Sequence, residues 1–176
     1  MDAAQLRAIQ APIKERYRDD PAAARITLRA TGTLDDVRIA CKIETGRALA
    51  IAGLHPSTGG SGAELCSGDM LLEALVACAG VTLKAVATAL QIHLHSAAVL
   101  AEGDLDFRGT LGLAKDAPVG FAAIRLAFTV QTDAPQEKLD QLLKLTERYC
   151  VVYQTIRSGT PIDVRMDKGS AQPRRS

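Results

Sequence analysis

The chain has 176 residues, of which 47% are hydrophobic and 23% are charged, a balance typical of one soluble globular domain. Its 21 basic and 20 acidic residues give a formal net charge of +1, and only 3% of its residues are aromatic. We therefore expect no nucleic-acid partner, since such proteins carry basic patches or aromatic stacking surfaces. Polar residues interrupt the most apolar region, and the N-terminal residues lack the apolar core of a signal peptide, so we expect no membrane span and a cytoplasmic location.

The N-terminal segment is predicted to form a helical arm. Over residues 5–18, apolar residues recur at the spacing of an amphipathic helix, and Pro12 is expected to interrupt it because proline lacks a backbone N–H. The segment is too short to bury a core of its own. We therefore divide the chain into an arm over residues 1–24, a domain over residues 25–168 and a flexible tail over residues 169–176.

Strands follow the arm. Apolar and polar residues alternate with a period of two over residues 26–29 and 37–44, which is typical of half-buried strands. Residues 48–54 are a third predicted strand. Turns are expected at residues 32–36 and 45–47, where glycine and polar residues gather. The first two strands are therefore predicted to form a hairpin.

A glycine-rich loop over residues 55–62 leads into a predicted long helix over residues 69–90. Asp69 suits the helix start, because a carboxylate there accepts hydrogen bonds from free backbone N–H groups and faces the positive end of the helix dipole. The spacing of apolar residues predicts a stripe that faces the core. This stripe comprises Leu72, Leu75, Val76, Ala79, Leu83, Val86 and Leu90.

The second half of the chain predicts two strands, a helix and a last strand. The strands are expected at residues 92–107 and 122–131, Pro135 opens the helix, and residues 162–166 form the last strand. The predicted order is therefore arm, three strands, helix, two strands, helix and strand. The apolar face of the second helix comprises Leu139, Leu142, Leu143, Thr146 and either Tyr149 or Cys150.

Two motifs resemble ligand sites but are incomplete. The run Gly59-Gly60-Ser61-Gly62 precedes a helix, but it lacks the Lys-Ser/Thr pair of a P-loop and the spacing of a dinucleotide-binding fingerprint. His93 and His95 have a spacing that serves metals, but no further ligand stands at a matching distance. We therefore interpret the glycines as a flexible connector and expect neither a metal nor a bound cofactor.

Four cysteines remain to be interpreted. Cys41 shares a strand face with apolar residues and is expected in the core, and Cys66 lies in a predicted loop. Cys78 lies in the middle of the first long helix, flanked by alanine and glycine, and Cys150 ends the second helix on its apolar side. Burial is the default for cysteine, so inert core thiols are one interpretation. A pair of reactive thiols is the other, if both helices pack on the same sheet.

Two blocks of sequence resemble the OsmC/Ohr superfamily of osmotically inducible and organic hydroperoxide resistance proteins. The segment SGDMLLEALVAC, which ends at Cys78, resembles the helix opening of these proteins. The segments RYC, which ends at Cys150, and GTPIDV are similar to their second cysteine block. The likeness covers residues 26–166 and fits the OsmC-like branch. It implies an OsmC-like α+β fold, with antiparallel sheets around two long central helices, in an intertwined homodimer whose sites lie at the subunit interface.

The resemblance also implies a thiol peroxidase that reduces organic hydroperoxides and is recycled by an external dithiol, in this family often a lipoyl-bearing protein. Cys78 matches the peroxidatic cysteine, which becomes a sulfenic acid, and Cys150 matches the resolving cysteine, which forms a disulfide with it. An arginine near the first strands activates the thiolate in such enzymes. Arg38 lies nearest that place, with Arg47 as a substitute. A cation is expected because Cys78 lies far from the N-terminus of its own helix.

The chain departs from the family pattern near both cysteines. The glutamate that usually stands ten positions before the first cysteine is replaced by Gly68, and the acid stands one position later, at Asp69. A step of nine residues turns a helix by about half a revolution, so Asp69 is expected to cap the helix rather than face Cys78. Glu73 is a further supporting candidate, and Val151 stands where proline usually follows the second cysteine. The alternative functions are an OsmC-like small-ligand binding or carrier protein and a purely structural dimer.

Overall fold

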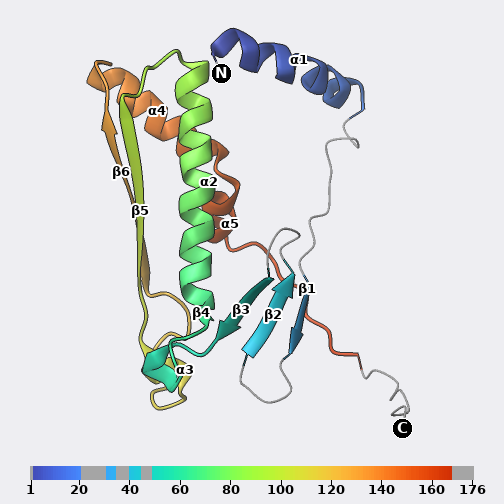
Figure 1. The fold of residues 1–176 in the computed structure, drawn as a ribbon, viewed down its shortest axis with the longest axis vertical. Helices are drawn as coiled ribbons and strands as arrows, with labels where there is room; N and C mark the ends of the chain where they lie inside the picture. The colour runs from blue at the N-terminus through green and yellow to red at the C-terminus, as the bar shows by residue number, and fades with distance from the viewer. Residues whose placement is uncertain (1, 21–30, 35–39, 45–48, 168–176) are drawn as a thin grey trace.

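The computed structural model describes residues 2–20, 31–34, 40–44 and 49–167 (Figure 1). The predicted strand over residues 26–29 lies outside these ranges, as do Arg38 and Arg47. The described elements combine helices with two separate sheets, so the mixed α and β content predicted from the sequence is confirmed. The division into arm, domain and tail stays a prediction.

Helix α1 (Ala3–Asp19) is longer than the predicted arm helix and continues through Pro12. A capping box fixes its start: the Asp2 side chain accepts a hydrogen bond from the Gln5 N–H at 2.8 Å, and the Gln5 side chain accepts one from the Asp2 N–H at 2.9 Å. The prediction that Pro12 interrupts the helix is wrong, because one missing N–H leaves the hydrogen bonds of the other turns in place. Ala3 is buried, so the first turn anchors α1 to the rest of the chain.

The first sheet has the strand order β1-β2-β3-β4. Its strands are β1 (Thr31–Leu34), β2 (Ala40–Glu44), β3 (Leu49–Gly53) and β4 (Leu65–Cys66). The first three are antiparallel, and β4 runs parallel to β3. The predicted strands over residues 37–44 and 48–54 correspond to β2 and β3. The predicted turn at residues 32–36 is wrong in its first part, because Gly32 and Thr33 pair with β2 in the ladder.

The glycine-rich loop folds back against the end of β3. It contains a 3-10 turn, η2 (Pro56–Thr58), which ends at Gly59 in the left-handed conformation, with a φ of 92°. A Cβ atom at Gly60 would lie 1.7 Å from the Leu54 carbonyl oxygen, so only glycine fits there. The loop is a tightly folded connector that leads the chain into the next helix.

Helix α2 (Ser67–Ala89) is the longest element, with 23 residues (Figure 1). Cys66 occupies its N-cap position without a side-chain hydrogen bond. The prediction that Asp69 caps the helix is therefore wrong: Asp69 lies inside the first turn, where its charge faces the positive helix end. The buried stripe has one residue per turn, as expected for a helix packed on one side. It comprises Leu75, Ala79, Leu83 and Ala87.

The second sheet is a long antiparallel ribbon of β5 (Ser96–Asp104) and β6 (Ala123–Gln131). Partly buried and exposed residues alternate along β6, as predicted for residues 122–131. His93 and His95 precede β5 rather than lying in a strand, and a short helix, α3 (Phe107–Thr110), begins where that strand was predicted to end. The partly buried face of the ribbon includes Val99, Ala101, Ile124, Leu126, Phe128 and Val130.

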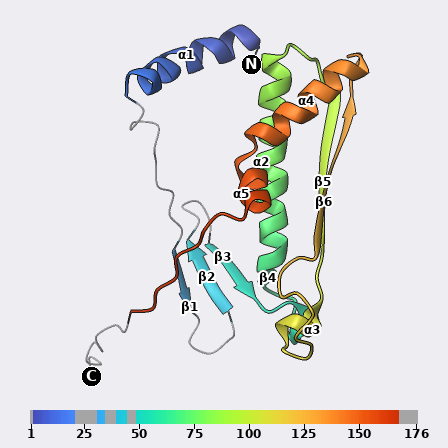
Figure 2. The same ribbon diagram turned by 180° about the vertical axis from the view of Figure 1, so that it is seen from behind.

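The predicted second helix consists of two helices, α4 (Gln136–Tyr149) and α5 (Val151–Ser158), with 14 and 8 residues. The backbone at Cys150 is extended, with φ −74° and ψ 108°, and this separates them. β-Branched residues lose rotamer freedom in a helix, and Val151 and Val152 follow the break directly. Figure 2 shows α4 and α5 lying across one side of α2. The expected two long central helices are therefore not confirmed within the described chain.

The buried core lies where the C-terminal half of α2 meets α4 and the ribbon. Leu83, Ala87, Ile92 and Leu142 form this cluster, with Phe128 and Val130 of β6 against it. On the predicted face of the second helix, Leu142, Thr146 and Cys150 are buried, whereas Leu143 and Tyr149 are exposed. The core therefore fixes α4 on α2 and, through α4, the position of Cys150.

Much of α2 is left uncovered on the side away from α4 and α5. An 18-residue window of this helix has a mean hydropathy of 1.8, so the helix meets the length and composition test for a membrane-crossing helix, a test that core helices of soluble proteins also pass. Only 22% of that window is buried within one chain. In Figure 1, α2 lies in front of α4 and α5, and no described element crosses it on that side.

The C-terminal segment does not form the predicted strand. Residues 162–166 belong to no helix or strand, and no described strand pairs with them. Ile162, Val164 and Met166 are 84%, 89% and 98% exposed. The prediction is wrong for the single chain, because an alternating pattern forms a strand only where a neighbouring strand satisfies its backbone hydrogen bonds.

Candidate active site

Cys78 lies midway along α2 and is half-buried. One turn later, the Thr82 hydroxyl donates a hydrogen bond to the Cys78 carbonyl oxygen at 2.8 Å. Small neighbours permit close packing at this level of the helix: a Cβ atom at Gly80 would lie 3.6 Å from the side chain of Val99 in β5. The small residues around Cys78 therefore let β5 pack close to this level of α2.

Cys150 lies at the break between α4 and α5. Its backbone N–H donates to the Thr146 carbonyl oxygen at 3.0 Å, and its side chain is buried, with 1% of its surface exposed. The two thiols are near enough to shift each other's pKa, and both cysteines are free. The packing of α5 on α2 thus brings together two thiols that lie far apart in the sequence.

Opposing effects act on the pKa of the Cys78 thiol. Burial raises it, and four hydrogen bonds lower it, from the Val152 N–H, the Cys150 thiol, the Val151 N–H and the Thr82 hydroxyl. Donors directed at sulfur stabilise its negative form. Together they outweigh burial, so the pKa of Cys78 lies below the ordinary value of a cysteine.

The pKa of Cys150 moves in the opposite direction. Burial raises it, and although the Tyr153 N–H lowers it, the hydrogen bond to Cys78 and the negative charge on Cys78 raise it further. The pKa of Cys150 therefore lies above its ordinary value. This arrangement favours a Cys78 thiolate that accepts a hydrogen bond from a protonated Cys150.

The sequence pattern does not reveal the source of the backbone donors. Cys78 is far from the N-terminus of α2, which is why a cation was the expected partner of the thiolate. The break at Cys150 creates a second helix N-terminus, that of α5, and the N–H groups of Val151 and Val152 there lower the pKa of the Cys78 thiol. The local signal for that break is the Val151-Val152 pair, but nothing local indicates that α5 begins beside Cys78.

The other predicted site residues do not join the thiol pair in the described chain. Asp69 and Glu73 lie on the first two turns of α2 and are exposed. Among the described residues, neither is a hydrogen-bond partner of the Cys78 thiol. Arg38 and Arg47 lie outside the described ranges, so the activating arginine stays a prediction.

Cys66 and the histidine pair lie elsewhere. Cys66 precedes α2, roughly 18 Å from Cys78 along the helix axis at about 1.5 Å per residue, and lines a separate cavity. The His95 ring nitrogen lies 2.9 Å from the Asp133 carboxylate. The His93 and His95 rings meet edge to face, with 4.8 Å between their centroids. Within the described ranges, no three His, Cys, Asp or Glu side chains gather as metal ligands would.

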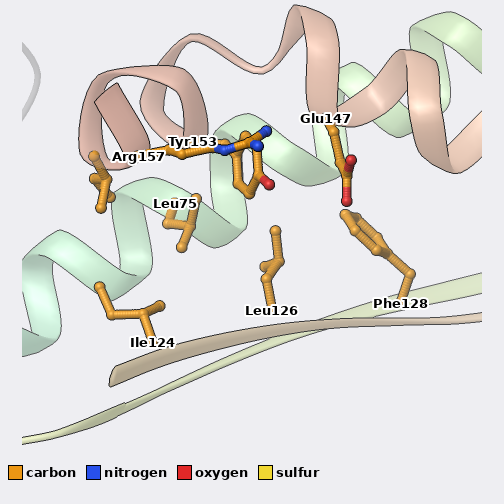
Figure 3. A pocket seen from close by; sticks show the side chains of 8 residues that line it. Leu75, Ile124, Leu126, Phe128, Glu147, Tyr153 and Arg157 are labelled. Carbon is orange, nitrogen blue, oxygen red and sulfur yellow. The ribbon is translucent and has the colours of Figure 1, made fainter. Parts of the chain in front are cut away.

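A cavity of about 350 Å³ lies between α2, β6 and the α4–α5 helices (Figure 3). Neither thiol lines it, but Leu75, one turn before Cys78, and Tyr153, three residues after Cys150, form part of its wall. Glu147 and Arg157 supply further polar groups. The apolar part of the wall is Leu75, Ile124, Leu126, Phe128 and Ile156.

Comparison with known proteins places the chain in a family. Residues 60–165, which include both Cys78 and Cys150, match the family model described as OsmC-like protein. Among curated proteins, no sequence matches the chain.

Solved structures share its fold at low sequence identity. An OsmC-like protein from Mycoplasma pneumoniae superposes with a TM-score of 0.62 at 14% identity, over 75% of this chain and 88% of that chain. An organic hydroperoxide resistance protein OsmC from Legionella pneumophila superposes with a TM-score of 0.59 at 16% identity, over 76% of this chain and 92% of that chain. An organic hydroperoxide resistance protein from Elizabethkingia anophelis superposes with a TM-score of 0.59 at 16% identity, over 76% of this chain and 89% of that chain. Since the family model covers more than half of the sequence and these folds agree with it, the chain belongs to the OsmC-like protein family.

Proposed function

We propose that this protein is a thiol-dependent peroxidase that reduces organic hydroperoxides to alcohols through Cys78 and Cys150. The carrying observation is the pair of free, neighbouring thiols whose surroundings lower the pKa of Cys78 and raise that of Cys150. The thiolate is the reactive form of cysteine. Family membership and the names of the Legionella and Elizabethkingia proteins support the same chemistry.

The first half of the reaction oxidises Cys78. Its thiolate attacks the terminal oxygen of the hydroperoxide, a sulfur–oxygen bond forms, and the O–O bond breaks. The alkoxide leaves with the electron pair and takes a proton to become the alcohol. Sulfur has then lost two electrons, the peroxide has gained them, and Cys78 is a sulfenic acid.

The second half restores the thiols. The Cys150 sulfur attacks the Cys78 sulfur, a disulfide forms, and the sulfenic oxygen leaves as water with the Cys150 proton. An external dithiol, which we propose is of the lipoyl type, reduces this disulfide by two successive thiol exchanges and is itself oxidised to a disulfide. No bound cofactor takes part, and the electrons come from the dithiol.

The surroundings of the pair support an organic substrate. The cavity beside it has mainly apolar walls, which favour a hydroperoxide with a hydrocarbon part. We also propose that Arg38 adds a cation near the thiolate, with Arg47 as its substitute and Asp69 and Glu73 in supporting positions. A cytoplasmic location without nucleic-acid or membrane partners stays a prediction from the sequence.

We further propose that the protein is a homodimer. The uncovered side of α2 supports this proposal, because a long apolar helix with so little of its surface buried needs a partner surface. Val81, on α2, is 72% exposed. A second copy would cover this side and bring the two copies of Cys78 near the interface.

Peroxide consumption with a dithiol donor tests the proposed enzyme. We expect wild type to turn over cumene hydroperoxide and Cys78→Ser to lose at least about a hundredfold in rate, because the nucleophile is gone. Cys150→Ser should consume about one equivalent and accumulate a sulfenic acid on Cys78, detected by mass spectrometry. Cys66→Ser, in a separate cavity, is the matched control and should retain the wild-type rate. A Cys78 that remains reduced after peroxide treatment of wild type would refute the proposal.

The cavity favours one second candidate, a small-ligand carrier. Its wall contains neither thiol but carries Arg157 and Tyr153 beside an apolar surface, so a ligand could occupy it without contacting the cysteines. A carrier would bind an apolar fluorescent probe equally well in wild type and in Cys78→Ser, and wild type would not consume peroxide. Leu126→Trp, which fills the cavity, should abolish probe binding under this function.

A further inference from the structure

A second cavity lies at the start of α2, beside α3 (Figure 1). Three segments that are far apart in the sequence enclose it: the end of β3 with the η2 loop, the first turns of α2, and the connection between β5 and β6. Its volume is about 410 Å³, and small-molecule sites span roughly 300–1,000 Å³. Cys66 lines this cavity, whereas Cys78 and Cys150 do not.

The wall of this cavity is uncharged. Within the described chain, no Asp, Glu, Lys or Arg side chain lines it, in contrast to the cavity that contains Glu147 and Arg157. Two of its polar residues are already engaged: the Thr58 hydroxyl donates to the His55 carbonyl oxygen at 2.9 Å, and His55 Nδ1 accepts from the Ser57 N–H at 3.0 Å. A charged ligand would find no opposite charge here, so the wall favours an uncharged one.

Aromatic rings gather at this cavity in a chain that has few of them. Two of the three phenylalanines, Phe107 and Phe121, line it. The His55 ring stacks on that of Phe107, with 4.9 Å between centroids and 23° between planes. A Cβ atom at Gly103 would lie 2.4 Å from the Phe121 ring, so the glycine lets that ring lie directly against β5. These rings provide flat apolar surfaces that suit a ligand with a ring of its own.

Exposed apolar side chains gather at the same place. Leu54, Leu71, Leu105 and Val119 all line the cavity and are all exposed. Single exposed apolar residues are ordinary on a protein surface, but a contiguous group of them marks an interaction site. A ligand seated here would remove these side chains from water.

We propose that this cavity binds a small, uncharged, ring-bearing apolar molecule, at a site separate from the thiol pair. The ring of the ligand packs against Phe107 and Phe121, and the apolar area that leaves water provides the binding free energy. The site lies roughly 18 Å from Cys78 along the axis of α2, at about 1.5 Å per residue. The inference therefore does not rest on the proposed peroxidase.

Gly68 offers a substitution that fills the cavity. It lies in the first turn of α2 without a positive φ, so its backbone accepts any side chain. A Cβ atom there would lie 3.5 Å from the Phe121 ring and 3.6 Å from the Cys66 sulfur, which is ordinary contact. Gly68→Leu places further atoms in the cavity, and leucine has the higher helix propensity. Gly68→Ala is the matched control, because it adds only the Cβ atom that fits.

The first test is fluorescence titration of the folded, full-length protein with acetyl-dimethylaminonaphthalene, an uncharged aromatic ketone whose emission shifts to the blue in apolar surroundings. We expect wild type and Gly68→Ala to bind it alike, and Gly68→Leu to weaken binding at least about tenfold, as overpacking of a filled site implies. Leu126→Trp, which fills the other cavity, should bind like wild type. Loss of binding in Leu126→Trp but not in Gly68→Leu would overturn the inference, as would a wild type without saturable binding.

A second test uses wild type alone. Cys66 lines the cavity and is half-buried, so a bound molecule should shield its thiol. With the naphthalene ketone at about ten times its Kd, iodoacetamide should alkylate Cys66 about tenfold more slowly, because only the unoccupied fraction reacts. Alkylation of Cys78 should keep its rate, and mass spectrometry of the two peptides measures both.

Equal Cys66 rates with and without the ketone would overturn the inference. A Cys66 thiol that is unreactive in both cases, together with no binding of the ketone, would show that another surface, such as a second copy of the chain, covers the cavity, and would also overturn it. Neither test uses peroxide. Failure of wild type to consume peroxide would therefore refute only the proposed enzyme.

Discussion

At the scale of single residues, Cys78 and Cys150 differ only in what surrounds them. Both are partly or fully buried, and burial raises the pKa of each. The first N–H groups of α5, the Cys150 thiol and the Thr82 hydroxyl lower the pKa of Cys78 by more than burial raises it. Cys150 donates to a negative neighbour, which adds to the effect of burial. As pH rises, Cys78 should therefore lose its proton first, and Cys150 should remain a thiol until higher pH.

Thr82 provides a residue-scale prediction. Its hydroxyl donates to the Cys78 carbonyl oxygen at 2.8 Å and also lowers the pKa of the Cys78 thiol. Thr82→Val removes the hydroxyl and keeps the shape. We expect the Cys78 pKa to rise and the peroxide rate at neutral pH to fall about three- to tenfold, since a bond to a charged group is lost. Stopped-flow peroxide kinetics across pH measure this.

Thr82→Ser is the control for that substitution. It retains the hydroxyl and removes only a methyl group, so the pH profile should match wild type. If Thr82→Val and Thr82→Ser slow the reaction equally, packing rather than hydrogen bonding explains the effect.

At the scale of elements, α4 is held by one side only. Leu142 is 2% exposed within the core cluster, whereas its neighbour Leu143 is 44% exposed. Leu142→Ala should lower the free energy of unfolding by about 2–5 kcal/mol, because it leaves a cavity where α4 meets α2. Leu143→Ala should cost less than about 1 kcal/mol. Urea denaturation followed by circular dichroism compares them, and equal losses would contradict this account of how α4 is anchored.

The break between α4 and α5 is the element-scale feature that makes the site. An uninterrupted helix would carry its N–H groups in intrahelical bonds past Cys150 and leave none for sulfur. The extended backbone at Cys150 instead ends one helix and begins another within a single residue. This break thus places the first N–H groups of α5 where they lower the pKa of Cys78, which the straight helix α2 does not do from its own backbone.

At the scale of the whole molecule, the uncovered side of α2 governs assembly. Val81→Asp places a charge on this side. In a dimer interface that carboxylate would be buried without a partner, and burying an unpaired charge is costly. We expect wild type to sediment as a dimer and Val81→Asp to shift toward monomer in analytical ultracentrifugation. Leu113→Asp is the control, because Leu113 is equally exposed, at 75%, but lies in the connection between α3 and β6. A monomeric wild type, or a Val81→Asp protein as dimeric as wild type, would contradict the proposal.

Periodic patterns predicted much of this fold because burial on one face leaves a repeat in the sequence. The apolar alternation of residues 122–131 predicted β6, and the apolar spacing after residue 69 predicted α2. Elements that depend on a neighbouring strand were predicted poorly. Thr31–Leu34 forms a strand because β2 pairs with it. Residues 162–166 form no strand, because no described strand pairs with them.

The sequence by itself determined that Cys78 and Cys150 each lie on or at the end of a packed helix, and it carried the family pattern around them. Only the tertiary structure decided that the two thiols meet, and that the start of α5 meets them. The physical reason is that a pKa depends on every donor within hydrogen-bonding distance, and those donors come from a helix far along the chain. Local sequence encodes which residues are buried, whereas packing determines which buried groups face each other.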